Sequence, residues 1–184
     1  MSHPIVLITF YSRCGSTEKL AMTAAVGVTQ ARAHVRLRRL SDANPEEFSA
    51  CKETIDRMRK EYVPPAEPDI VSADAIIFGI PSDFTVSSPE WTRFMDLLHR
   101  IHSEGKVAGK VAAIVSPVAS GERSGAALMS FTASIIELGL IFVPSGFGRT
   151  PRTTLNPADH ALAHGRKVAA ITQALQQAIQ GHIR

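Results

Sequence analysis

Hydrophobic residues occur along the chain in short β-branched runs that alternate with longer segments of helical spacing. Residues 4–10 form a near-continuous apolar run, as expected of a strand buried on both faces of a parallel sheet. Similar runs predict strands at 34–40, 75–80, 110–118 and 140–143. Five strands that alternate with helices predict an α/β fold, a doubly wound parallel sheet with helices on both faces.

Four segments have the spacing of amphipathic helices: 16–31, one that opens at 88–90, 125–138 and 158–179. Their apolar residues lie three or four positions apart, which predicts that one face of each helix packs on the sheet. In the helix that opens at 88–90 this face includes Trp91, which we expect in the core. In the last helix the inward set is Val168, Ile171, Leu175 and Ile179.

The segment 44–68 interrupts this alternation, because it is rich in charges and closes with three prolines, at 64, 65 and 68. Pro45 followed by two glutamates is a favourable helix start. We therefore expect one polar helix and then an irregular linker. The chain is predicted to be a single domain over 1–184, with this polar insertion near 44–68.

Composition supports an ordinary globular protein, with 45% hydrophobic and 20% charged residues. No apolar run is long enough for a membrane span. The opening residues lack the basic region and cleavage site of a signal peptide, so the cytoplasm is the expected compartment. The formal charge of +3 is mild and the basic residues are dispersed, so nucleic acid is not an expected partner.

The two cysteines, Cys14 and Cys51, do not form a Cys-x-x-Cys pair and cannot make a zinc site alone. A disulfide between them stays open, but reduced thiols are the expected state. His99 and His102 lie three residues apart on one predicted helix. Because they lack a third ligand, we expect surface histidines and no metal site.

Three loops follow the predicted strands at the edge where doubly wound sheets bind ligands, outside the carboxyl ends of the strands. They are 11–17, 81–87 and 116–125.

The first of these loops, Tyr-Ser-Arg-Cys-Gly-Ser-Thr, has the sharpest motif in the chain. Hydroxyls of Ser12, Ser16 and Thr17 surround the start of a helix, and Gly15 permits close backbone approach. Unpaired N–H groups and the helix dipole favour an anion there, such as a phosphate monoester. The plainer alternative is that Ser16 and Thr17 only cap the helix. Arg13 either assists the anion or points to solvent.

Other phosphate-binding motifs do not match this loop. The Gly-x-x-x-x-Gly-Lys-Ser/Thr pattern of P-loop nucleotidases is missing, and so is the Gly-x-Gly-x-x-Gly pattern of dinucleotide sites. A thiol phosphatase built on Cys14 would need an arginine six residues later, where this chain has Leu20.

The loop 11–17 and the Glu-Lys-Leu-Ala that follows it resemble the phosphate loop of flavodoxin-like NAD(P)H:quinone oxidoreductases, the relatives of the tryptophan-repressor-binding protein. Residues 75–84 resemble their third strand and the loop that borders the flavin. Residues 109–116 and 139–144 resemble their fourth and fifth strands. The resemblance implies a flavodoxin-like sheet of strand order 2-1-3-4-5.

It also implies a non-covalently bound FMN, NAD(P)H as electron donor, a small acceptor such as a quinone, and a homodimer or homotetramer. No catalytic residue is assigned, because in a flavoprotein the cofactor performs the redox chemistry. The expected cofactor-binding residues are Ser12, Arg13, Cys14, Gly15, Ser16 and Thr17 in the first loop, Pro81, Ser82, Asp83, Phe84, Thr85 and Val86 in the second, and Ser116, Pro117, Val118, Ala119, Ser120 and Gly121 in the third.

In the second loop, backbone N–H groups of 84–86 are expected at the pyrimidine edge of the flavin. Phe84 either packs near the ring or belongs to the core. Asp83 either donates a proton near the flavin N5 or is a solvated loop carboxylate, and the second role is the expected one. The chain departs from the family at two positions. Asp83 replaces a cationic residue, and the histidine that the family has just before the glycine of its fifth strand is missing before Gly139. The basic loop 149–152 either receives a nicotinamide phosphate or has no ligand.

Two other functions stay open. One is a flavodoxin-type electron carrier without a substrate of its own, although such carriers often have an acidic docking face and this chain is weakly basic. The other is a binding module of the same fold that has lost its flavin.

Overall fold

The computed structural model of the chain describes residues 3–43, 49–85, 87–117, 124–145 and 156–182. Five parallel strands form one sheet in the order β2-β1-β3-β4-β5. This arrangement confirms the predicted strand order and the parallel sheet. The last two strands are shorter than predicted. The strands are β1 (Ile5–Phe10), β2 (His34–Arg39), β3 (Ala75–Gly79), β4 (Val111–Val115) and β5 (Ile141–Phe142).

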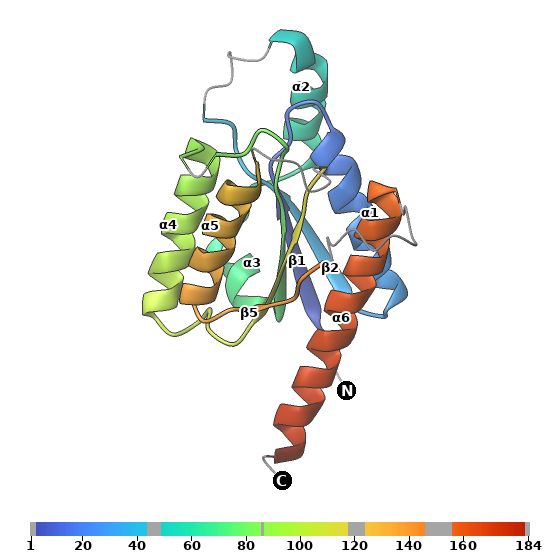
Figure 1. The fold of residues 1–184 in the computed structure, drawn as a ribbon, viewed down its shortest axis with the longest axis vertical. Helices are drawn as coiled ribbons and strands as arrows, with labels where there is room; N and C mark the ends of the chain where they lie inside the picture. The colour runs from blue at the N-terminus through green and yellow to red at the C-terminus, as the bar shows by residue number, and fades with distance from the viewer. Residues whose placement is uncertain (1–2, 44–48, 86, 118–123, 146–155, 183–184) are drawn as a thin grey trace.

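Helices cover both faces of this sheet, as Figure 1 shows. The helices α1 and α6 lie over one face, and α3, α4 and α5 lie over the other. Their bounds are α1 (Ser16–Gln30), α2 (Lys52–Glu61), α3 (Glu67–Ser72), α4 (Pro89–Ser103), α5 (Ser124–Glu137) and α6 (Pro157–His182).

The core consists of two layers, because successive side chains of a strand point to opposite faces of the sheet. Ile8 and Phe10 of β1 pack in the layer under α1 and α6. Leu7 packs in the other layer, where Phe78 and Trp91 belong to an aromatic cluster under α4 and α5. The prediction that Trp91 is a core residue is confirmed.

The two helices on the first face, α1 and α6, approach each other at a pair of glycines. A Cβ atom at Gly27 would lie 2.1 Å from the Leu162 carbonyl oxygen, and one at Gly165 would lie 2.1 Å from the Ala24 carbonyl oxygen. A side chain at either position would therefore force the helices apart. The spacing of α1 against α6 depends on these glycines.

The far end of α6 extends beyond the sheet, as Figure 1 shows. Val168 is buried where the helix crosses the sheet, but Ile179 near its end is 54% exposed. The prediction that Ile179 points inward is therefore wrong. The helical spacing of apolar residues continues beyond the edge of the sheet, where α6 has no surface to pack against.

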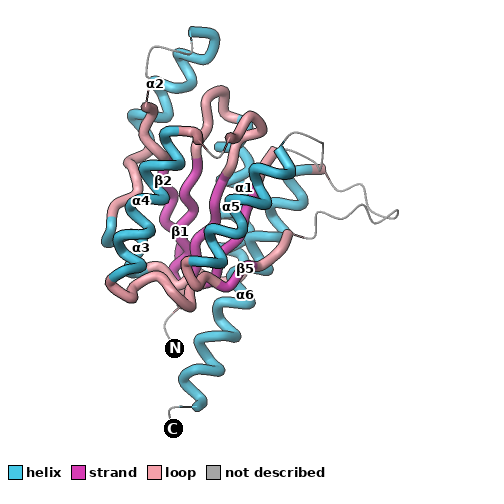
Figure 2. The backbone as a smooth tube through the Cα atoms, turned by 60° about the vertical axis from the view of Figure 1, so that its left-hand side comes forward, coloured by secondary structure: helices cyan, strands magenta, loops and turns pink. Residues whose placement is uncertain are grey.

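The segment after β2 differs from its prediction. A short 3-10 helix, Ser49–Cys51, leads into α2, and the predicted helix start at Pro45 lies outside the described residues. The expected linker contains a second helix, α3, because Pro68 occupies its first turn and the Asp69 carboxylate accepts the N–H of Ala66. Figure 2 shows α2 beyond the carboxyl ends of the strands.

No helix among the described residues combines the length and the apolar character that crossing a bilayer requires.

Candidate functional site

The loops that follow β1 and β3 meet at the switch point of the sheet. The Tyr11 N–H donates to the Gly79 carbonyl at 3.1 Å, and the Leu40 N–H donates to the Phe10 carbonyl at 2.8 Å. These bonds hold the carboxyl ends of three strands level where the chain turns into α1. In doubly wound sheets this is the edge that binds ligands.

The turn into α1 is stabilised before any ligand binds. Gly15 is the residue before the helix and has a φ of +88°, in the left-handed region that favours glycine. Its N–H donates to the Ser12 Oγ at 3.1 Å, while the Arg39 guanidinium donates to the Ser12 carbonyl at 3.0 Å. The Ser12 hydroxyl keeps its own proton as a donor for a ligand.

Thr17, in the first turn of α1, has a hydroxyl that needs a partner. Its Oγ1 is fully buried and has no hydrogen-bond partner in the described part of the chain. Its methyl group faces the end of β3, because a Cβ at Gly79 would lie 3.4 Å from the Thr17 Cγ2. A buried hydroxyl without a partner costs free energy. A phosphate oxygen at the helix N-terminus would supply the missing partner, so these residues fit the phosphate of FMN.

The plainer reading of this turn, in which Ser16 or Thr17 caps the helix, does not describe it. The capping position belongs to Gly15, which has no side chain to satisfy the first N–H groups of α1. Ser16 is exposed beside them. Hydroxyls and N–H groups therefore lie together at the positive end of the helix dipole.

A carboxylate also lies at this turn. Glu18 is buried, and its Oε2 would be 3.5 Å from a Cβ at Gly15. Both of its oxygens accept from Arg57 of α2, at 2.9 and 2.6 Å, and one also accepts from the Tyr62 hydroxyl. The Arg57 bonds hold the pKa of Glu18 below its usual value. Glu18 is thus an anion next to the turn, and Arg57 neutralises it.

Arg13 joins the first loop to the second. Its guanidinium forms an ion pair with Asp83 at 2.7 Å, so its side chain is not free in solvent. The Asp83 side chain is half exposed. Tyr11 lies beneath, with the Arg13 and Arg39 guanidinium carbons 5.8 and 5.5 Å from its ring centre. Burial raises the pKa of Tyr11 to about 12, so this phenol stays protonated.

Phe84 belongs to the core rather than to an open flavin face. It is buried, and its ring packs edge-on against Trp91 and Phe131, with ring centres 6.2 and 5.5 Å away. Its N–H donates to the Pro81 carbonyl, and the Thr85 N–H donates to the Ser88 hydroxyl. Two of the three N–H groups expected at the flavin edge, those of Phe84 and Thr85, therefore already have partners, and the third, of Val86, lies outside the described residues.

The rest of the predicted site is described only in part. Ser116 is buried, Pro81 and Pro117 are half-buried, and Ser82 is exposed. Val86, Val118, Ala119, Ser120, Gly121 and the basic loop 149–152 lie outside the described residues.

The two cysteines are joined in the structure. Cys14 of the first loop and Cys51 just before α2 form a disulfide, with their Cα atoms 5.3 Å apart. The expectation of reduced thiols is therefore wrong. The pairing depends on the path of the insertion, which brings Cys51 back to the first loop. A sequence separation of 37 residues gives no sign of that path.

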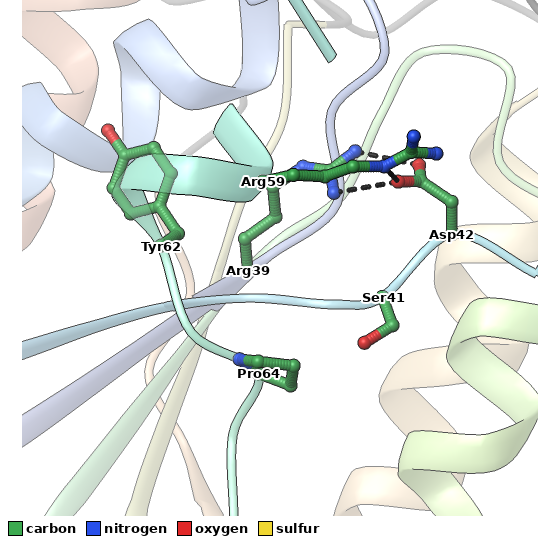
Figure 3. A pocket seen from close by; sticks show the side chains of 6 residues that line it. All are labelled: Arg39, Ser41, Asp42, Arg59, Tyr62 and Pro64. Atoms are coloured by element: carbon green, nitrogen blue, oxygen red, sulfur yellow. Dashed lines mark hydrogen bonds and ion pairs between the residues drawn. The ribbon is translucent and has the colours of Figure 1, made fainter. Parts of the chain in front are cut away.

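A pocket of about 220 Å³ lies between the end of β2 and the last turn of α2 with the residues that follow it. Figure 3 shows two guanidinium groups, of Arg39 and Arg59, at the carboxylate of Asp42. Burial alone would raise the pKa of Asp42, but these two arginines lower it. The pocket lies at the outer edge strand and not at the switch point. Its lining residues are Arg39, Ser41, Asp42, Arg59, Tyr62 and Pro64.

The described residues bring no three metal-ligating side chains together. His99 is exposed and His102 is half-buried.

The chain is similar in sequence to known proteins. The model of the family described as NADPH-dependent FMN reductase matches residues 5–153. An NAD(P)H dehydrogenase (quinone) of Archaeoglobus fulgidus is 33% identical over 112 residues, which are 59% of this chain and 59% of that protein. A protein of the same name from a Chelativorans species is 27% identical over 77% of this chain and 71% of its own length. The chain thus spans little more than half of the first of these relatives.

Solved structures show the same fold. A flavodoxin described as WrbA-like, from Agrobacterium tumefaciens, superposes with a TM-score of 0.61 at 18% identity, over 93% of this chain and 98% of that one. The flavodoxin of Megasphaera elsdenii gives 0.57 at 18% identity, over 90% and 98%. These likenesses confirm the flavodoxin-like fold. The narrower relation to the tryptophan-repressor-binding protein stays a prediction.

Proposed function

Because the chain belongs to the NADPH-dependent FMN reductase family, we propose that it is an oxidoreductase that binds FMN and passes electrons from NAD(P)H to a small acceptor. The observation that carries this proposal is the buried hydroxyl of Thr17 at the N-terminus of α1, which finds no hydrogen-bond partner among the residues that the structure describes. Phosphate is the group that best satisfies such a hydroxyl together with free helical N–H groups.

In this proposal the FMN phosphate lies at the N-terminus of α1, among Ser12, Gly15, Ser16 and Thr17. The flavin ring extends toward the loops that follow β3 and β4, where the sheet changes winding direction. Bound FMN supplies the hydride and single-electron chemistry. This chain supplies the binding site and its charge, so no side chain is assigned as acid, base or nucleophile.

A quinone is the first acceptor to test. The relatives from Archaeoglobus fulgidus and Chelativorans are named as NAD(P)H dehydrogenases that act on quinone. Glu137 and Leu138 stand before Gly139, where the oxidoreductases that the sequence resembles have a histidine. We therefore propose that the acceptor is a quinone or another small molecule. We also propose that the reaction takes place in the cytoplasm.

We also propose a homodimer or homotetramer, with α5 in the contact between copies. This helix has no charged residue before Glu137. Its exposed side includes Met129 and Ile136, together with Ala126 and Ala133 at the spacing of a helix–helix seam. A second copy would cover this stripe through its own α5. Met129→Asp should lower the molecular mass measured by light scattering to that of a monomer.

Two measurements on the purified chain test the function. Titration with FMN should quench flavin fluorescence to saturation, and NAD(P)H should then be oxidised faster when a quinone is added. FMN binding without any NAD(P)H oxidation would favour the electron carrier instead. A protein that takes up no FMN would contradict the proposal and favour a binding module that has lost its flavin.

A further inference from the structure

We propose that Cys14 and Cys51 form a redox modification site, whose disulfide holds α2 against the phosphate turn and so raises its affinity for FMN. This inference rests on the assignment of that turn to the FMN phosphate. It concerns how binding is controlled rather than which cofactor binds.

The disulfide joins two elements that matter for the turn. Cys14 lies between Ser12 and Gly15, the two residues that shape the loop. Cys51 immediately precedes α2. The bond therefore fixes the start of α2 at the loop and restrains the loop at the same time.

The helix α2 also carries Arg57, which neutralises a carboxylate beside the turn. Arg57 binds both oxygens of Glu18, whose carboxylate lies next to Gly15. If α2 moves away, Glu18 loses the arginine that bonds to it and presents more negative charge to an incoming phosphate dianion. Repulsion between the Glu18 carboxylate and a nearby phosphate opposes binding. The disulfide thus maintains the contact that makes the turn favourable for an anion.

A second chain of contacts links α2 to the backbone of the loop. Arg59 donates to Asp42, which accepts two bonds from Arg39, and Arg39 donates to the Ser12 carbonyl. Displacement of α2 would remove one partner of Asp42 and loosen the position of Arg39. Two routes therefore transmit the state of the disulfide to the turn, one through charge and one through hydrogen bonds.

The helix α2 depends on the disulfide and on these polar contacts for its position, because little of it is buried. Only Ile55 and Met58 are buried among its residues, and Figure 1 shows it outside the layers formed by the other helices. Short polar helices are marginal without external contacts. Reduction of the disulfide should therefore allow α2 to move relative to the turn.

The disulfide is also accessible to reagents. Cys14 is exposed and Cys51 is half-buried. A thiolate of a small dithiol can attack the Cys14 sulfur, break the S–S bond and release Cys51, which takes a proton from water. The second thiol then displaces Cys14, which is protonated in turn, and the reagent leaves as its cyclic disulfide. Two electrons pass from the dithiol to the protein, and a small-molecule disulfide reverses the reaction.

The test compares FMN binding by the oxidised and the dithiothreitol-reduced full chain, with Cys51→Ser as the matched variant because it leaves the loop sequence unchanged. Reduction should weaken FMN binding by about three- to tenfold, as expected when a preorganised site loses a restraint. Cys51→Ser should bind like the reduced protein and should not respond to dithiothreitol. Equal affinities of the oxidised and reduced wild-type protein would overturn the proposal while leaving the proposed function intact.

Two further readouts do not depend on FMN. Alkylation followed by mass spectrometry should modify neither cysteine before reduction and both after it; modification of both in the oxidised protein would refute the disulfide. Hydrogen exchange of the amides at 11–17 should accelerate on reduction. If neither form takes up FMN, the assignment of the turn to the FMN phosphate fails. If reduction also leaves the exchange rates at 11–17 unchanged, the proposal that the disulfide restrains the turn fails as well.

Discussion

The guanidinium of Arg57 donates to both carboxylate oxygens of Glu18, at 2.9 and 2.6 Å. Glu18 is in the first turn of α1, and Arg57 comes from the polar insertion between β2 and β3. A carboxylate in that position would oppose an incoming phosphate. The insertion therefore contributes to the candidate binding site through charge, although no residue of it was expected to take part.

Replacement of this arginine should weaken FMN binding. Arg57→Gln removes the positive partner of Glu18, so the FMN dissociation constant should rise about three- to tenfold in dilute buffer, and less at high salt because the site is partly screened. Fluorescence titration measures the change. Glu61→Gln is the control, because Glu61 is the exposed second partner of Arg57.

The double variant Glu18→Gln/Arg57→Gln separates charge from structure. If Arg57 acts by neutralising Glu18, removal of both charges should restore most of the affinity. Affinity that stays as low as in Arg57→Gln would show that the role of the arginine is not electrostatic.

Gly27→Ala should destabilise the fold through the contact of α1 with α6. The new methyl group would lie 2.1 Å from the Leu162 carbonyl oxygen, and the atoms nearest to it belong to the backbone of α6, so the helices must separate. The free energy of unfolding should fall by about 3 kcal/mol, the cost of overpacking a tight contact. Urea denaturation followed by circular dichroism measures it.

Gly181→Ala, in the same helix α6, is the matched control. A Cβ there meets nothing within 4 Å. Its stability should be unchanged or higher by up to about 1 kcal/mol, because alanine favours the helix. Equal losses in both variants would mean that the crossing does not depend on Gly27.

His164 should make the stability of the protein depend on pH. Burial lowers its pKa to about 4, and its Nε2 lies 3.2 Å from the Val143 carbonyl, which the neutral ring can bind as a donor. The unfolded chain takes up a proton near pH 6.5, before the folded protein does. Stability should therefore be complete above pH 7 and fall by about 2 kcal/mol between pH 7 and pH 5 through this group.

Comparison with His164→Gln isolates this contribution. The variant keeps an amide donor for Val143 but does not titrate, so its unfolding free energy should fall less over the same range. Parallel pH profiles for the two proteins would show that another group is responsible. Urea denaturation at pH 7, 6 and 5 provides the profiles.

The sheet could be predicted because its signal is local. The apolar run of β1, the turn at 11–17 and the helical spacing of α1 each follow from neighbouring residues. Their order then leaves few ways to wind a parallel sheet. The turn's hydroxyls and Gly15 could be identified in the same way, since all of them lie within six residues.

What the sequence did not reveal depends on contacts between distant segments. Cys51 and Arg57 reach the turn only because the insertion folds back over the end of the sheet, and no periodicity records that path. The burial of Phe84 by Trp91 and Phe131 likewise requires three separate elements to meet. Ile179 shows the opposite error, because a helical pattern does not say where the sheet beneath it ends.

An equilibrium titration of Thr17→Val with FMN tests most directly whether the turn between β1 and α1 holds the cofactor's phosphate. Valine keeps the buried shape of Thr17 and removes only the unpartnered hydroxyl. The variant should be at least as stable as wild type without ligand, because no hydrogen bond is lost. Its dissociation constant for FMN should rise about tenfold or more, the effect of one lost charge-assisted bond. Riboflavin, which lacks the phosphate, should bind both proteins equally. FMN binding by Thr17→Val as tight as that of the wild type would contradict the assignment.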